Sequence, residues 1–346
     1  MKAHYKKHIL EFKTPSGTSR GVLKTKEAWF IILEDQGKHG FGECGMLRGL
    51  SIDDRPDYED RLQWVCANIH LGMQELYDSL TEFPSIQIAV EMAFMSLHSY
   101  DPFQIYPSAF SQSEASIAIN GLIWMGDKAY MKEQIAAKLK QEFRCIKMKI
   151  GAIDFDTELA LLKNIRHEFS ASEIEIRVDA NGAFSPKNAL EKLKRLSDLE
   201  LHSIEQPIGV KQWDEMASLC KESPLDIALD EELIGIFSTK DKAVLLQHIN
   251  PQYIILKPSF IGGFAGSDAW ISCAEAQQIK WWITSALESN VGLNAISQYT
   301  FTKNSTLPQG LGTGSLYTNN IVSPLEIIRG TLRYNPIKKW KFIYNL

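Results

Sequence analysis

The sequence lacks long apolar runs, an excess of basic charge and closely spaced cysteines. Apolar runs such as Tyr253–Leu256 fall far short of the ~20 residues that a membrane-spanning helix needs, so we expect no membrane partner. The 37 basic and 42 acidic residues give a formal charge of −5, which predicts no basic surface for nucleic acid. The basic start of the chain is not followed by an apolar segment with a cleavage site, so we expect no signal peptide.

The five cysteines are scattered and odd in number. None of them has the spacing of a zinc-binding or redox motif, which favours a reducing cytoplasm. The chain has 346 residues, of which 45% are apolar. This is enough for one large core with a smaller accessory domain. No feature of the sequence fixes an oligomeric state.

The first part of the chain mixes strand and helix patterns. Ala28–Leu33 is rich in aromatic and β-branched residues, and the polar segment Asp35–Lys38 that follows is typical of a hairpin turn. From Tyr58 to His98 the pattern is helical, with a break at Phe83-Pro84. We therefore expect a small α+β domain over residues 1–114.

From about residue 115 onward, short β-rich segments alternate with helical ones, which is typical of parallel strands joined by crossover helices. The pattern predicts an α/β fold with an eight-fold (β/α) barrel over residues 115–324. A doubly wound open sheet is the competing fold, but no glycine-rich dinucleotide motif follows a strand. The expected strands are Ser116–Asn120, Cys145–Ile150, Ile174–Val178, Leu201–Ile204, Asp226–Leu229, Tyr253–Leu256, Trp281–Ile283 and an eighth near Leu307–Gly310.

Charged residues end five successive strands, where a barrel enzyme places its chemistry. They follow one another at intervals of 25 to 30 residues, close to one strand-plus-helix repeat, and we expect them at equivalent heights. Taken alone, each could be a helix cap or a structural ion pair, but their common phase and complementary signs favour a joint function. In chain order they are Lys149, Asp179, Glu205, Asp230 and Lys257.

The three carboxylates offer oxygen ligands of the kind that suits Mg²⁺ better than Zn²⁺, and no histidine belongs to the ring. Strand alternation places Lys147 and Lys149 on one side. Burial and the charge of Lys147 would lower the pKa of Lys149 and make it a base, with Lys257 facing it across the barrel. This arrangement suits removal of a proton alpha to a carboxylate, since the metal stabilises the enediolate.

Other interpretations stay open at this point. A metal-free lyase could use Lys149 or Lys257 as a Schiff base, and a binding protein could keep the fold without the chemistry. Arg177 and Asn181, on either side of Asp179, could support that carboxylate or contact substrate directly.

The motifs Lys-x-Lys, Asp-x-Asn, Glu-Gln-Pro, Asp-Glu and Lys-Pro, in this order, resemble the enolase superfamily and specifically its muconate-lactonizing-type subgroup. The resemblance implies a modified TIM barrel with an N-terminal α+β capping domain. It also implies Mg²⁺, for which Mn²⁺ may substitute, on Asp179, Glu205 and Asp230. Loops around Thr14–Arg20 and Gly45–Asp54 would close over the substrate, and the tail 325–346 would pack on the capping domain.

Three features resemble the branch of this subgroup that dehydrates 2-succinyl-6-hydroxy-2,4-cyclohexadiene-1-carboxylate to 2-succinylbenzoate in menaquinone biosynthesis. They are Arg177 before the first carboxylate, the segment Thr284–Ser289 and the segment Gly310–Gly314. In the dipeptide epimerases, Asp-x-Asp stands where this chain has Gly312-Thr313-Gly314. The resemblance implies a syn elimination with Lys149 as base and then acid, and Lys257 as a cation on the opposite face. The substrate contacts that it implies are Arg177, Asn181, Ser285, Glu288, Gly312 and Thr313.

The same scaffold also supports a second reaction class. Racemisation of N-acylamino acids, or epimerisation of dipeptides, would use Lys149 and Lys257 as bases on opposite faces of an α-carbon. The small carboxylate substrate and the metal would be shared with the dehydratase interpretation.

Overall fold

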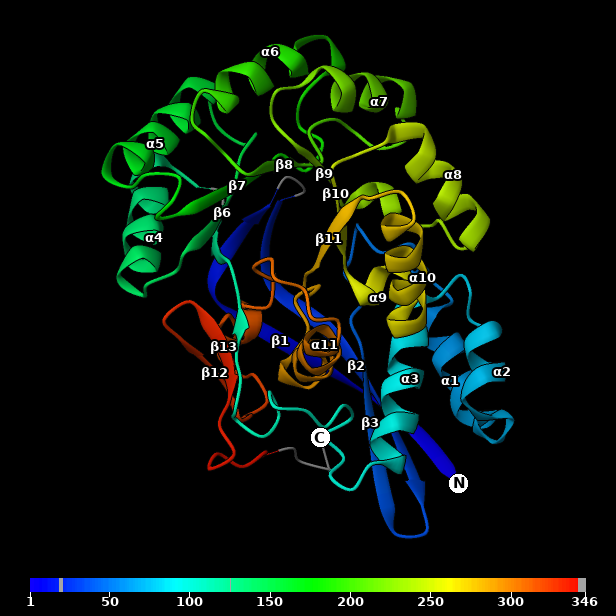
Figure 1. The fold of residues 1–346 in the computed structure, drawn as a ribbon. Helices are drawn as coiled ribbons and strands as arrows, with labels where there is room; N and C mark the ends of the chain where they lie inside the picture. Colours follow the sequence, from blue (N-terminus) through cyan, green and yellow to red (C-terminus); the bar gives the residue numbers. More distant parts are fainter. Residues whose placement is uncertain (19–20, 125, 342–346) are drawn as a thin grey trace.

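The computed structural model describes residues 1–18, 21–124 and 126–341, and its overall arrangement is shown in Figure 1. The chain begins with a three-stranded antiparallel sheet in the order β1-β2-β3. Between β2 and β3, Gln36 and Gly37 have φ values of 50° and 78°, as expected for a two-residue hairpin turn. This is the hairpin that the polar segment predicted. The strands are β1 (Lys2–Thr18), β2 (Gly21–Asp35) and β3 (Lys38–Cys44).

The helical region of the capping part divides into α1 (Tyr58–Ala67), α2 (Gly72–Asp78) and α3 (Pro84–His98). The predicted break is confirmed, because Pro84 occupies the first position of α3. Helix α3 lies directly against β3. A Cβ on Gly42 would stand only 1.8 Å from the carbonyl oxygen of Ala89, so this close packing requires glycine.

The predicted barrel is confirmed. Seven parallel strands form one sheet in the order β11-β10-β9-β8-β7-β6-β5. Isolated bridges from Gln309 to Ile119 and from Gly310 to Thr284 join its two edges. The eighth strand position of the barrel, or eighth stave, is therefore short. The strands are β5 (Gly121–Ile123), β6 (Cys145–Lys149), β7 (Glu175–Asp179), β8 (Ser203–Glu205), β9 (Ile227–Leu229), β10 (Tyr253–Leu256) and β11 (Lys280–Ile283).

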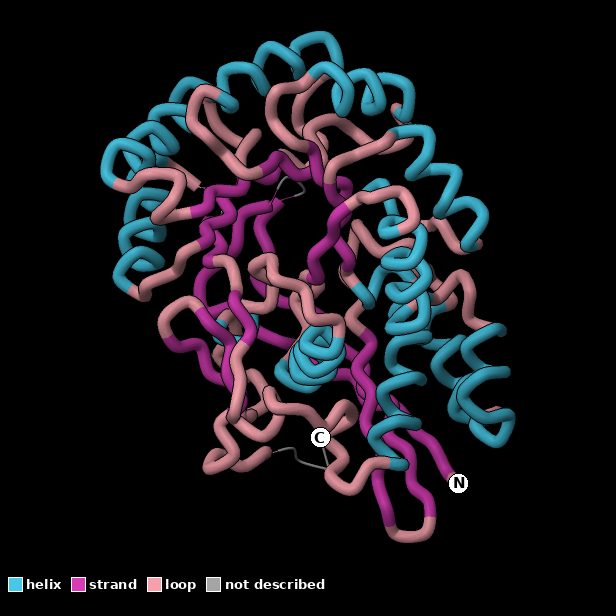
Figure 2. The backbone as a smooth tube through the Cα atoms, in the orientation of Figure 1, coloured by secondary structure: helices cyan, strands magenta, loops and turns pink. Residues whose placement is uncertain are grey.

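Helices cover the outside of the curved sheet, as Figure 2 shows. In α6, the buried residues Ala189, Leu193 and Leu196 recur at intervals of three and four and so lie on one face of the helix. The helices of this layer and the one that follows β11 are α4 (Lys128–Lys140), α5 (Phe155–Glu168), α6 (Pro186–Ser197), α7 (Trp213–Glu222), α8 (Thr239–Ile249), α9 (Pro258–Ile261), α10 (Gly263–Glu275) and α11 (Asn290–Thr302).

The first barrel strand lies later in the chain than predicted. The expected strand Ser116–Asn120 contains β4 (Ile117–Ala118), which pairs with β13 (Thr331–Tyr334) in a separate antiparallel sheet. The barrel strand β5 begins only at Gly121. Apolar residues continue through both strands, so periodicity alone does not show that the backbone changes partner between them.

The C-terminal part contacts both the barrel and the capping region. Strand β12 (Leu325–Ile328) pairs with β13, and the Trp340 ring stacks on Phe103 with 4.2 Å between centroids. Residues 342–346 of the predicted tail lie outside the described residues, and the division of the chain at residues 114 and 324 stays a prediction.

Two expectations about composition can be compared with the structure. All five cysteines are free. In the described part of the chain, the helices are too short or too polar to cross a membrane.

The capping region also contacts the barrel through Glu91 of α3. Its carboxylate accepts hydrogen bonds from the backbone N–H groups of Phe264 (2.6 Å) and Ala265 (3.0 Å) in the first turn of α10. Burial raises the pKa of Glu91 to about 7, even though both N–H groups oppose the shift. The folded protein therefore binds a proton at Glu91 more tightly than the unfolded chain does.

This shift predicts how stability depends on pH. An acid with a raised pKa in the folded state contributes stability at low pH, and the contribution is lost as the pH rises from about 4.5 through 7. We expect the free energy of unfolding of the unmodified protein to fall across this interval relative to Glu91→Gln, measured by urea titration. The exposed Glu133→Gln should leave the profile unchanged; parallel profiles for all three proteins would contradict the prediction.

Candidate active site

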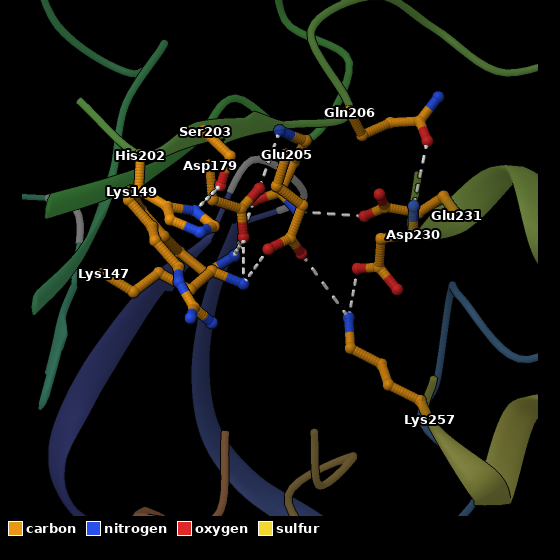
Figure 3. Close-up of polar contacts among 12 residues, drawn as sticks. Lys147, Lys149, Asp179, His202, Ser203, Glu205, Gln206, Asp230, Glu231 and Lys257 are labelled. Atoms are coloured by element: carbon orange, nitrogen blue, oxygen red, sulfur yellow. Dashed lines mark hydrogen bonds and ion pairs between the residues drawn. The ribbon is translucent and has the colours of Figure 1, made fainter. Parts of the chain in front are cut away.

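The charged strand ends meet at the carboxyl-terminal side of the barrel, as Figure 3 shows. From β6, the Nζ atoms of Lys147 and Lys149 each lie 2.9 Å from Oδ2 of Asp179. The alternation of β6 thus directs both ammonium groups to the same side, as predicted. Lys147 also forms an ion pair with Glu205, which ends β8.

Lys257 approaches the carboxylates from another side (Figure 3). It forms an ion pair with Asp230, and its Nζ lies 4.0 Å from Oε1 of Glu205. Lys149 and Lys257 therefore flank a row of three acidic residues. The carboxylates of Asp179, Glu205 and Asp230 are all buried, with at most 3% of each residue exposed.

Asn181 holds the Lys149 side of the site. Its Oδ1 accepts a hydrogen bond from Lys149 Nζ at 2.6 Å, and its Nδ2 donates to Oε1 of Glu231 at 2.9 Å. Its backbone N–H donates to Asp179 Oδ1 at 3.0 Å. Asn181 has a φ of 44°, in the left-handed region that non-glycine residues adopt rarely outside functional or turn positions. Glu231 was not singled out from the sequence.

The pKa values of Asp179 and Glu205 are shifted in opposite directions. Burial disfavours the ionised form of Asp179, but Lys147 and Lys149 outweigh it and lower the pKa of this acid. At Glu205, burial and the adjacent Asp179 charge raise the pKa well above its ordinary value. Oε2 of Glu205 pairs with the Lys147 ammonium, and its Oε1 lies 4.0 Å from Nζ of Lys257.

These observations test whether the residues fit a divalent cation. Three neighbouring carboxylates supply the oxygen ligands that Mg²⁺ prefers, and burial together with the adjacent charge of Asp179 raises the pKa of Glu205, the middle acid of the three. The ammonium groups presently lie among the acids, and the described part of the chain contains no acidic, histidine or cysteine triad already converged on a metal position. The donor set fits the ion in charge and type.

A cavity of about 350 Å³ lies beside these groups. Lys147, Lys149, Lys257 and Asn181 line it, and so do Ser285, Gly312 and Thr313 from the seventh and eighth staves. The hydroxyl oxygens of Ser285 and Thr313 are 2.6 Å apart, which brings two distant segments of the chain together at one wall.

Apolar residues of the capping region complete the cavity. Leu47 and Leu50 come from the expected loop Gly45–Asp54, and Leu23 comes from β2. Thr14 also lines the cavity, but it lies in β1, so the expected loop Thr14–Arg20 is strand as far as Thr18. Residues 19 and 20, at the end of the first predicted loop, lie outside the described residues. The individual leucines could not be identified from the sequence, because a single apolar residue in a loop is not part of any periodic hydrophobic pattern.

Two of the expected substrate contacts do not line the cavity. Arg177 donates hydrogen bonds to Glu175 (2.7 Å) and to the carbonyl oxygen of Pro308 (2.9 Å). Its guanidinium carbon lies 4.1 Å from the Trp282 ring. It is therefore buried inside the barrel, behind Asp179 on the same strand.

Glu288 is likewise behind the cavity wall. Its carboxylate accepts hydrogen bonds from the hydroxyl of Ser259 (2.5 Å) and the backbone N–H of Ala286 (2.7 Å). Ala286 lines the cavity, so Glu288 fixes the shape of this wall from outside.

Glu43, at the end of β3, joins the capping region to the barrel. Its Oε2 accepts hydrogen bonds from the Ser289 hydroxyl (2.5 Å) and the Gly292 N–H (2.8 Å), and its Oε1 accepts from the Ser289 N–H (2.7 Å). This carboxylate caps the first turn of α11. Lys26 is buried nearby; burial lowers its pKa, opposed by the charges of Glu43 and Glu288.

With this geometry established, comparison with known proteins places the chain in a class. Residues 130–335 match the family described as enolase C-terminal domain-like. The chain belongs to this family.

Within the family, one relative is similar over nearly its whole length. The chain is 47% identical to the o-succinylbenzoate synthase of Desulfotalea psychrophila, covering 96% of this chain and 98% of the relative. The crystal structure of MenC from the same organism superposes with a TM-score of 0.86 at 43% identity, covering 96% and 99% of the two chains. The N-succinylamino acid racemase of Thermus thermophilus is 36% identical, over 80% of this chain and 75% of that protein.

The contacts of Glu43 predict a measurable coupling between cap and barrel. In Glu43→Gln, an amide replaces a carboxylate that accepts three hydrogen bonds, and we expect a loss of about 1–3 kcal/mol in the free energy of unfolding. KM should rise, because Leu47 and Leu50 follow Glu43 in the chain and line the cavity. Thermal unfolding and steady-state kinetics would measure both effects. Glu75→Gln, at an exposed position of α2 in the capping region, serves as the control; an unchanged melting temperature in Glu43→Gln would contradict this coupling.

Proposed function

We propose that this chain acts as an o-succinylbenzoate synthase, a hydro-lyase of the enolase superfamily. The reaction is the syn dehydration of 2-succinyl-6-hydroxy-2,4-cyclohexadiene-1-carboxylate to 2-succinylbenzoate and water, in menaquinone biosynthesis. The main support is 47% identity over 96% of the chain to a relative of that name. The five free cysteines support a cytoplasmic enzyme.

Lys149 is the proposed base and acid. Its amine removes the ring proton alpha to the carboxylate, and the electron pair of that C–H bond enters the enediolate. The same nitrogen, now an ammonium, protonates the departing hydroxyl as the C–O bond breaks, which releases water and leaves an aromatic ring. Asn181 and Asp179 hold this nitrogen at 2.6 and 2.9 Å, so it is oriented before substrate arrives.

Lys257 and Lys147 have supporting roles in this proposal. Burial works against their charge, but Asp230 beside Lys257 and Asp179 beside Lys147 outweigh it and raise both pKa values. Both side chains therefore stay protonated. Lys257 faces the ring from the side opposite Lys149 as a cation, and Lys147 balances the charge of Asp179 and Glu205.

Asp179, Glu205 and Asp230 would hold Mg²⁺ or, in its place, Mn²⁺. Such an ion supplies positive charge that stabilises the two oxygens of the enediolate. The support for it is the position of these three buried carboxylates at the ends of adjacent strands and the raised pKa of Glu205, which burial and the adjacent charge of Asp179 cause.

The remaining predicted residues divide into two groups. Ser285, Gly312 and Thr313 line the cavity together with Asn181, and we propose that they bind the small carboxylate substrate. Arg177 and Glu288 lie behind the wall and position other residues. For Arg177, the contact with Pro308 fixes the segment that leads into the eighth stave.

The similarity to an N-succinylamino acid racemase supports a second candidate function. Racemisation would use Lys149 and Lys257 as alternating base and acid on the two faces of the α-carbon. The two functions differ in the fate of the second lysine, because only racemisation requires Lys257 to exchange a proton with substrate.

Removal of the base should abolish dehydration. In Lys149→Arg, the positive charge is retained but the side chain does not deprotonate at neutral pH, so we expect a fall in kcat of about 10²–10⁴-fold. Formation of 2-succinylbenzoate, followed by its ultraviolet absorbance, measures the effect. Lys163→Arg, at an exposed position of α5, should retain full activity; comparable rates in both variants would contradict the role of Lys149.

Metal removal and substrate comparison test the rest of the proposal. EDTA should abolish activity, and Mg²⁺ or Mn²⁺ should restore it, whereas a Schiff-base lyase would ignore EDTA and be inactivated by borohydride. With N-succinylamino acids in D₂O, exchange at the α-carbon would reveal racemisation. Efficient exchange without dehydration of the cyclohexadiene acid would replace the synthase assignment by the racemase one.

A further inference from the structure

The cavity is bounded on one side by a helix that carries no predicted site residue. Tyr130, Gln134, Ala137 and Lys138 of α4 line the same cavity as the three lysines of the strand ends. Leu122 and Phe143 line it between these two regions. The cavity therefore offers an apolar wall that leads from the catalytic groups to a fourth cation.

Lys138 differs from the other buried or half-buried lysines of the site. Lys147, Lys149 and Lys257 each pair with an acidic residue. For Lys138, no acidic partner lies within 4.0 Å among the described residues. Its ammonium faces the Phe143 ring, with Nζ 5.0 Å from the centroid, and burial lowers its pKa. Lys138 is a half-buried cation without an acidic partner in the described part of the chain.

The fold makes specific room for this side chain. A Cβ on Gly121, the first residue of β5, would stand 3.0 Å from Cδ and 3.1 Å from Cγ of Lys138. The absence of a side chain at Gly121 thus lets the aliphatic part of Lys138 lie against the barrel strand. The neighbouring Gln134 is held by the backbone of Trp124, because its Oε1 accepts from the Trp124 N–H at 2.8 Å and its Nε2 donates to the Trp124 carbonyl oxygen at 3.0 Å.

The chemistry of the proposed substrate calls for such a group. Substrate and product each carry two carboxylates, one on the ring and one at the end of a flexible acyl chain. The ring carboxylate must lie beside the proton that Lys149 removes. The acyl chain contains two methylene groups, which suit the apolar wall, and a terminal charge that needs a cation to offset its desolvation.

We infer that Lys138 binds the terminal carboxylate of the acyl chain and so selects substrates with a second negative charge. This inference rests on the proposed function, since it takes its ligand from that reaction. Lys13 also lines the cavity, but it is exposed, and solvent screens its charge more strongly.

Two ligands and three variants test this role. 2-Succinylbenzoate carries the terminal carboxylate, and 2-butyrylbenzoate replaces it by a methyl group. Calorimetric titration of the Mg²⁺-loaded full-length protein measures the Kd of each. We expect Lys138→Met to raise the Kd of 2-succinylbenzoate about 10-fold or more, as for loss of a hydrogen bond to a charged group. The Kd of 2-butyrylbenzoate should change less than about 3-fold. Lys138→Arg should restore most of the affinity for the dicarboxylate.

Lys140→Met is the matched control. It lies on the same helix and lines a neighbouring cavity but not this one, so both Kd values should stay unchanged. In kinetics, Lys138→Met should raise KM for the cyclohexadiene acid and leave kcat within about 3-fold, because the chemistry at Lys149 is intact. Lys13→Met should raise KM less than Lys138→Met does.

The outcomes separate the two proposals. Equal weakening of both ligands in Lys138→Met would mean a structural role, and no weakening would mean no role; either result overturns the inference. A larger and selective effect in Lys13→Met would transfer the role to that residue and overturn it too. If the unmodified protein forms no 2-succinylbenzoate, the proposed function fails, while the two Kd values still decide whether Lys138 recognises the second charge.

Discussion

The structure depends on a balance of buried charge at the end of the barrel. Three carboxylates on adjacent strands are almost fully removed from water, and three ammonium groups lie among them. Neither set would be stable alone at this depth, because an unpaired buried ion costs several kcal/mol. The acids and lysines therefore hold one another in place, and the strands that carry them must keep one register.

This register explains why the core of the site could be predicted from the sequence. Successive strand–helix repeats place the ends of parallel strands side by side. The regular spacing of Asp179, Glu205 and Asp230 along the sequence therefore predicts that they lie close together. Strand alternation did the same for Lys147 and Lys149. The boundary near Gly121 was wrong because apolar residues continue through β4 and β5, and only long-range pairing with β13 separates them.

The remaining functional groups depend on contacts without a local pattern. Glu43 caps α11 through Ser289, which lies 246 residues later in the chain, and no local periodicity connects the two. Arg177 shares its strand with Asp179, but only its contacts with Trp282 and Pro308 show that it lies below the cavity. A lysine on a helix ordinarily faces solvent, so Lys138 could be recognised only after Gly121 was seen beside it.

The anchoring of the first turn of α11 by Glu43 limits how the enzyme can admit its substrate. The Glu43 carboxylate accepts three hydrogen bonds from the barrel part of the chain. The capping region and the barrel cannot separate at this point without breaking all three. The cavity must then open through movement of the short segments beyond Glu43, such as the one that carries Leu47 and Leu50. New substrates could be accommodated during evolution by exchanging these segments, while the scaffold beneath them stayed untouched.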